Sequence, residues 1–99
     1  MTDITVKVTR NHYLVKALGH ADDPTVCAGI SALTQMLAGC LMNHDDVKTK
    51  TFTIEDGYVE LEWTSPGWKV LEDTKAMVIG LLQIELGYPK HVKIEQNIF

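Results

Sequence analysis

The spacing of apolar and polar residues divides the chain into seven segments of regular structure. Short apolar or alternating runs predict five β-strands, at residues 4–9, 12–18, 47–54, 58–64 and 91–95. Apolar residues at helical spacing predict two helices, at residues 25–43 and 68–86. Arg10-Asn11 and Glu55-Asp56-Gly57 are typical of hairpin turns, because Asp-Gly supplies the positive φ of a tight turn. The order ββαββαβ predicts one α+β domain over residues 1–99, a mixed or antiparallel sheet with two helices packed on it.

The first helix carries the most informative pattern. Asp22-Asp23-Pro24 predicts its start, with an aspartate as the cap and proline at the first helical position. The helix is apolar almost all round, which predicts that it is buried. One face carries small residues that let another element approach closely: Ala28, Gly29, Ala32, Met36 and Gly39. A different stripe, the only polar one, begins at Cys27 and includes Ser31, so we expect this thiol to face a groove.

Composition and charge exclude several classes of protein. The net charge of −4 and the pI near 5.4 argue against a nonspecific nucleic-acid binder, which needs clustered lysine and arginine. The first residues have no basic and apolar signal pattern, and the longest near-apolar stretch, 26–42, is interrupted by polar residues. The expectation is a soluble cytoplasmic protein without membrane contact. Cys27 and Cys40 are separated by about 20 Å along the predicted helix, too far for a disulfide, so both are thiols.

His20 and Cys27 are the residues with candidate chemistry. His20 lies in Gly19-His20-Ala21 at the end of a strand, and Cys27 follows seven residues later in the first turns of a helix. A helix N-terminus and a nearby imidazolium both favour a thiolate, and a thiolate beside a base can attack a carbonyl. Free N–H groups at this helix end are expected to help hold the oxyanion. The alternatives are that Cys27 is a small buried apolar residue and that His20 is a solvated loop residue.

Three further residues are supporting candidates. Ser31, one turn after Cys27, either orients the site and binds substrate or donates to its own helix backbone. Asp22 and Asp23 are candidates for orienting His20, although capping explains at least one of them. No Cys-x-x-Cys or His-x₃-His spacing and no glycine-rich phosphate loop occurs, so we predict no metal and no cofactor.

The segments Gly19-His20-Ala21 and Val26-Cys27-Ala28-Gly29-Ile30-Ser31-Ala32-Leu33 resemble those of the ribosomal-processing cysteine proteases, the Prp family. The order of elements matches that family along nearly the whole chain. The resemblance implies an endopeptidase, usually a homodimer, that removes the N-terminal extension of the large-subunit ribosomal protein numbered twenty-seven. Phage members are associated with capsid or scaffold proteins that carry a similar cleavage sequence.

Carried over by position, the resemblance makes Cys27 the nucleophile, His20 the base and Ser31 the family's serine one turn on. The chain departs from the family in the loop between histidine and cysteine. This loop is shorter, and Pro24 holds the position of an acidic residue, with Asp23 one earlier. Two alternatives remain: a non-catalytic dimeric interaction module associated with ribosome or phage assembly, and a thiol-based redox sensor.

Overall fold

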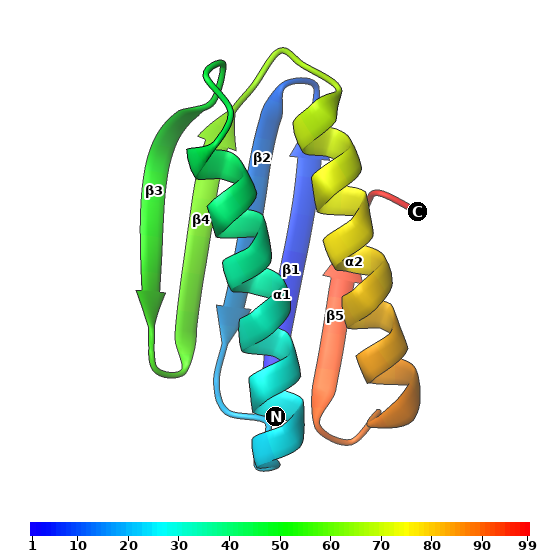
Figure 1. The fold of residues 1–99 in the computed structure, drawn as a ribbon. Helices are drawn as coiled ribbons and strands as arrows, with labels where there is room; N and C mark the ends of the chain where they lie inside the picture. The colour runs from blue at the N-terminus through cyan, green and yellow to red at the C-terminus, as the bar shows by residue number, and fades with distance from the viewer.

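The computed structural model describes residues 1–99, and its elements follow the predicted order (Figure 1). The strands and helices are β1 (Thr2–Thr9), β2 (His12–Leu18), α1 (Pro24–Met42), β3 (Lys48–Glu55), β4 (Tyr58–Thr64), α2 (Lys69–Gly87) and β5 (Val92–Gln96). The ends of each element lie within two residues of the predicted ones. The seven predicted segments and the α+β class are therefore confirmed.

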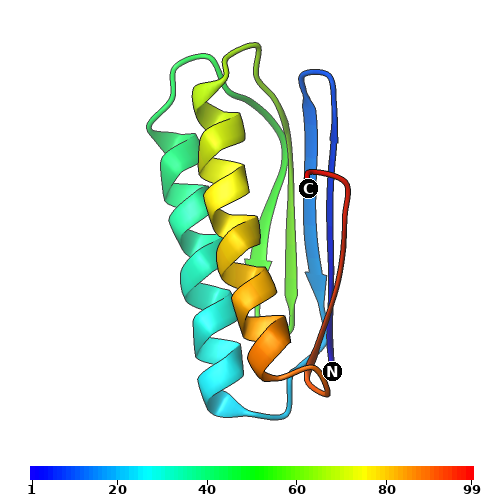
Figure 2. The ribbon, with the colours of Figure 1, turned by 90° about the vertical axis from the view of Figure 1, so that its right-hand side faces the viewer.

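The five strands form one mixed sheet in the order β3-β4-β2-β1-β5. The hairpins β1–β2 and β3–β4 and the central pair β2–β4 are antiparallel, whereas β5 pairs in parallel with β1. Both helices cover the same face of the sheet, so the molecule has two layers and the other face is open to solvent (Figure 2). This arrangement places the β2–α1 loop, the β3–β4 turn and the start of β5 at one end of the sheet (Figure 1).

The core lies between the sheet and the helices. Alternation along each strand turns one set of side chains inward, and Val59, Leu61 and Trp63 of β4 are all buried while their neighbours face outward. Trp63 is fully buried and stacks on Tyr13 of β2 with ring centroids 5.0 Å apart. The helices meet closely at Gly29, where an added Cβ would lie 3.0 Å from the Ile84 side chain.

The expectation that α1 is buried is wrong for much of its surface. Only one stripe faces the core, whereas Ala28, Ala32 and Met36 are exposed. In a two-layer fold the outer side of a helix has nothing to pack against, whatever its composition. Polar residues interrupt this segment and argue against a membrane span, yet by length and composition alone α1 is long and apolar enough to cross a membrane. Its inward side joins the core shared with the sheet, and it also packs on α2.

Candidate active site

His20 lies directly after β2, in a short loop that the backbone holds in a defined position. Gly19 has a φ of +96°, a conformation that residues with a side chain rarely adopt. Its N–H donates to the carbonyl of Gly57 at 2.9 Å, which joins the loop to the β3–β4 turn. The His20 side chain is 57% exposed and borders a small cleft of about 70 Å³ at this end of the sheet.

Cys27 reaches the same cleft from the first turn of α1. Asp23 caps this helix: its backbone is extended, and its Oδ1 accepts from the N–H groups of Thr25 at 2.9 Å and Val26 at 3.3 Å. Pro24 follows at the first helical position, as the sequence predicts. Cys27 is half-buried and Ser31, one turn further, also lines the cleft, so the polar stripe of α1 faces a groove as expected.

The helix N-terminus does not supply the expected oxyanion donors. Pro24 has no N–H, the next two N–H groups donate to the carboxylate of Asp23, and that of Cys27 donates to the Asp23 carbonyl at 3.0 Å. The Asp23 charge also offsets part of the positive end of the helix dipole. The expectation of free N–H donors is therefore wrong. The Ser31 hydroxyl lines the cleft and makes no hydrogen bond, which leaves it available to a ligand.

The β3–β4 turn contributes two residues to the site that sequence analysis assigned only to a turn. Asp56 Oδ1 lies 4.0 Å from His20 Nδ1, although the Asp56 side chain is 99% exposed. Gly57 has a φ of +73° and packs against the other side of the ring, where an added Cβ would lie 2.7 Å from His20 Nε2. The Asp-Gly pair carries a signal for a turn but none for this contact, which depends on how the two hairpins pair.

The two aspartates named as candidates for orienting His20 have other partners. Asp23 caps α1, and the carboxylate of Asp22 lies 3.4 Å from the N-terminal ammonium. Asp22 has a φ of +62°, so the chain makes its turn into α1 at this residue. The acidic group nearest the His20 ring is therefore Asp56. No lysine or arginine lines the cleft, whose rim carries Glu55 and Asp56.

Cys40, the second thiol, occupies a different environment near the far end of α1. Burial, and then the charge of Asp73 and a hydrogen bond to its carboxylate, raise the pKa of the Cys40 thiol. The same carboxylate pairs with His44 Nε2 at 3.0 Å. These contacts keep Cys40 in the neutral thiol form, which is a poor nucleophile.

A half-buried thiol and an imidazole that share one cleft, at one end of the sheet of a small α+β domain, define a candidate thiol hydrolase. Comparison with known proteins gives the particular class. The sequence profile of the family described as Cysteine protease Prp matches residues 1–93. The chain therefore belongs to the Prp family and is a cysteine protease, as the resemblance in the sequence implies. No curated protein sequence matches the chain.

The fold is similar to solved structures at low sequence identity. A ribosomal processing protease Prp from S. aureus, in complex with a covalently linked product peptide, has 19% identity and a TM-score of 0.82 and covers 98% of this chain and 100% of its own. The same protease with a substrate peptide has 19% identity and a TM-score of 0.72 over the same shares. SMU.848 from Streptococcus mutans has 20% identity and a TM-score of 0.74, covering 97% of this chain and 93% of its own.

Proposed function

We propose that this protease cuts peptide bonds with Cys27 as the nucleophile and His20 as its base. The observation that carries the proposal is the single cleft, which both side chains line together with Ser31. Cys40 does not compete for the role, because its thiol is held neutral beside Asp73. In this proposal His20 accepts the thiol proton at Nε2. The exposed Asp56 carboxylate, 4.0 Å from Nδ1, is beyond hydrogen-bond distance and contributes only a screened attraction to the charged ring.

The proposed reaction passes through a thioester. The Cys27 thiol gives its proton to His20, and the sulfur attacks the carbonyl carbon of the scissile peptide bond. The Ser31 hydroxyl donates to the developing oxyanion. His20 then returns the proton to the leaving amine as the carbon–nitrogen bond breaks. In the second half His20 takes a proton from water, the hydroxide attacks the thioester, and the acid is released with the thiol restored.

The proposed substrate is the N-terminal extension of the large-subunit ribosomal protein numbered twenty-seven, or a phage capsid or scaffold protein with a similar cleavage sequence. The S. aureus protein of the same fold, a ribosomal processing protease solved with a substrate peptide, supports a peptide substrate of this kind. The acidic rim of the cleft suits a segment with basic residues near the cut, since Glu55 and Asp56 face no lysine or arginine there.

The test is cleavage of the extended ribosomal protein, followed by mass spectrometry. Wild type and Cys40→Ala are expected to make one cut at the same bond, and Cys27→Ala and His20→Ala are expected to make none. Full activity of Cys27→Ala would overturn the assignment of the nucleophile. If Cys27→Ala supports ribosome or phage assembly as well as wild type does, the chain acts as an interaction module instead.

We propose further that the protein is a homodimer joined through the outer face of the helix layer. Helix α1 has no charged residue in its 19 positions, and Met36 of α1 and Ile79 of α2 are both exposed on this layer. Apolar patches of this kind mark interaction surfaces.

Light scattering is expected to give twice 11.1 kDa for wild type, and 11.1 kDa for Met36→Lys. The control is Leu18→Lys on β2, which is 51% exposed against 43% for Met36 but is not on the helix layer, and it should remain dimeric. A monomeric wild type would refute the dimer.

A further inference from the structure

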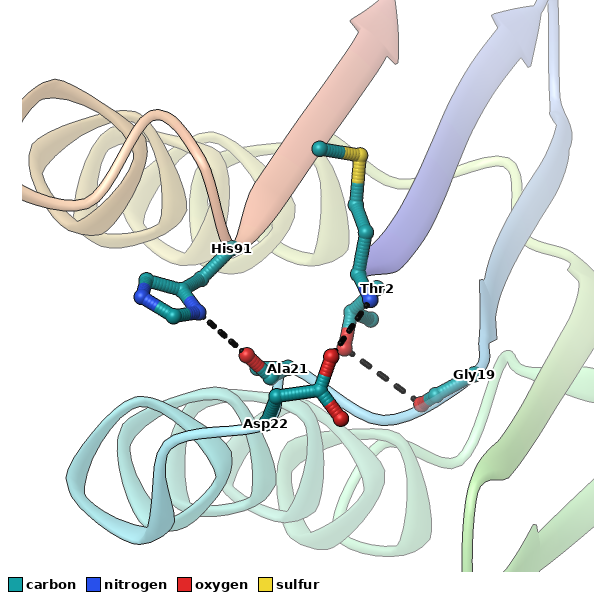
Figure 3. A network of polar contacts seen from close by, with 6 residues as sticks. Thr2, Gly19, Ala21, Asp22 and His91 are labelled. Carbon is teal, nitrogen blue, oxygen red and sulfur yellow. Dashed lines mark hydrogen bonds and ion pairs between the residues drawn. The ribbon is translucent and has the colours of Figure 1, made fainter.

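The loop between β2 and α1, which carries His20 and leads to Cys27, is contacted by residues from distant parts of the chain (Figure 3). The Thr2 hydroxyl, from the start of β1, donates to the Gly19 carbonyl at 3.3 Å. The ring of His91, just before β5, contacts the Ala21 carbonyl through Nδ1 at 2.5 Å. Ala21 follows His20 directly and is 0% exposed. His91, 70 positions after Ala21 in the sequence, therefore contacts the backbone next to the proposed base.

The contact from His91 has a defined direction. A carbonyl oxygen only accepts, so His91 Nδ1 carries the proton and donates to Ala21. The ring has this donor in its Nδ1–H tautomer and also in its charged form, so the bond is kept in both protonation states. His91 makes the only hydrogen bond to this carbonyl. A buried carbonyl that has no hydrogen-bond donor costs folding free energy. Loss of His91 is therefore expected to destabilise this conformation of the loop.

His91 is itself held in place. Its N–H donates to the Tyr88 carbonyl at 2.9 Å, and its carbonyl accepts from the Thr2 N–H at 2.9 Å. The Tyr88 ring packs against the His91 ring edge to face, with centroids 6.4 Å apart. His91 is thus attached to the end of α2 through Tyr88 and to the start of β1 through Thr2. Asp22, the next loop residue, has a φ of +62°, so the bond also stabilises the backbone beside a strained turn.

We propose that His91 is a positioning residue of the protease: its Nδ1–H holds the Ala21 carbonyl and so sets where His20 lies relative to Cys27. This inference rests on the proposed roles of those two residues. The end of α2 and the start of β5 would then contribute to the protease activity, although neither lines the cleft.

A set of three variants separates the hydrogen bond from the packing of the ring. His91→Phe keeps a ring against Tyr88 but has no donor, His91→Asn keeps an N–H donor without the ring, and His91→Ala has neither. Two measurements are made on each folded variant: hydrogen–deuterium exchange of residues 19–27, and the rate at which iodoacetamide alkylates Cys27. Cys40 is the control thiol in the same molecule, because it lies near the other end of α1.

We expect His91→Phe and His91→Ala to speed exchange in residues 19–27 and to slow alkylation of Cys27 and peptide cleavage by roughly tenfold to a hundredfold, the scale of a displacement near 1 Å. His91→Asn should recover most of the wild-type behaviour, and alkylation of Cys40 should not change. Wild-type exchange in His91→Phe would overturn the proposal, as would a His91→Asn variant as impaired as His91→Ala. Hydrogen exchange measures how well the loop is held and does not depend on catalysis. It therefore decides the role of His91 even if Cys27 proves not to be the nucleophile.

Discussion

Replacing Gly57 with alanine tests the site from the side of the β3–β4 turn. An added Cβ at this position would lie 2.7 Å from His20 Nε2, whereas ordinary contacts begin near 3.4 Å. The imidazole must therefore move by 0.7 Å, the difference between these distances, or the turn must open. The Nε2 atom is the one that we propose takes the proton from Cys27. The substitution thus displaces the reacting atom of the base without removing any functional group.

Two effects are expected, and they differ in size. The φ of +73° is unfavourable for alanine, which costs roughly 1–2 kcal/mol of folding free energy. For a domain of this length that lowers Tm by roughly 4–8 °C per kcal/mol. The displacement of His20 is expected to reduce kcat/KM by roughly tenfold to a hundredfold, because proton transfer depends on the position of the base.

A second substitution at the same position separates strain from displacement. Asparagine tolerates positive φ better than alanine but carries the same Cβ, so Gly57→Asn should recover stability and stay impaired in cleavage. The control is Gly39→Ala in α1, where an added Cβ meets nothing within 4 Å, and it should keep full activity and gain about 0.5–1 kcal/mol. A folded Gly57→Ala with wild-type kcat/KM would show that the position of His20 does not matter for the reaction.

Three further predictions concern the thiols, the helix cap and alkaline pH. At pH 7 iodoacetamide should label Cys27 faster than Cys40, since the Cys40 pKa is raised beside Asp73; equal rates would contradict the proposed dyad. Asp23→Ala should lower the free energy of unfolding by about 1 kcal/mol, because two N–H groups lose their acceptor, and a neutral effect in urea unfolding would exclude the cap. Folding raises the pKa values of Cys40 and Tyr13. The stabilisation from these two groups is therefore complete below their unfolded pKa values of 9.0 and 10.0 and is lost as the pH rises above them. A free energy of unfolding that stays constant up to about pH 11 would refute this.

The parts of the fold that depend on neighbouring residues could be predicted from the sequence. Period-two alternation gave β4, Asp-Gly gave the β3–β4 turn, and Asp23-Pro24 gave the first turn of α1. Helical periodicity also predicted that Cys27 faces a groove, because Cys27 lies on the only polar stripe of α1. Each of these signals is contained within a few residues, and no other part of the chain overrides it here.

The sequence was a poor guide where the result depends on how many layers the fold has. An uncharged helix is typical of a buried one, yet α1 is covered on one side only because the domain has two layers. Because α1 carries no charge, the sequence predicts that all its faces are buried, not that one apolar face is exposed. A partner on that face would reconcile the composition of α1 with its position, which is why we propose the dimer there.

The sequence predicts His20 and Cys27 as the central residues of the site, and both line the cleft. The groups that contact the backbone on either side of His20 come from Thr2, the β3–β4 turn and His91, which no local pattern connects to this loop. The oxyanion expectation failed for a related reason, since the cap at Asp23 that starts α1 uses the N–H groups that the reaction would need. Long-range contacts therefore bear on this loop from three separate parts of the chain. If the contact from His91 holds the loop as we propose, a change at His91 must alter the reactivity of Cys27, 64 residues away in sequence.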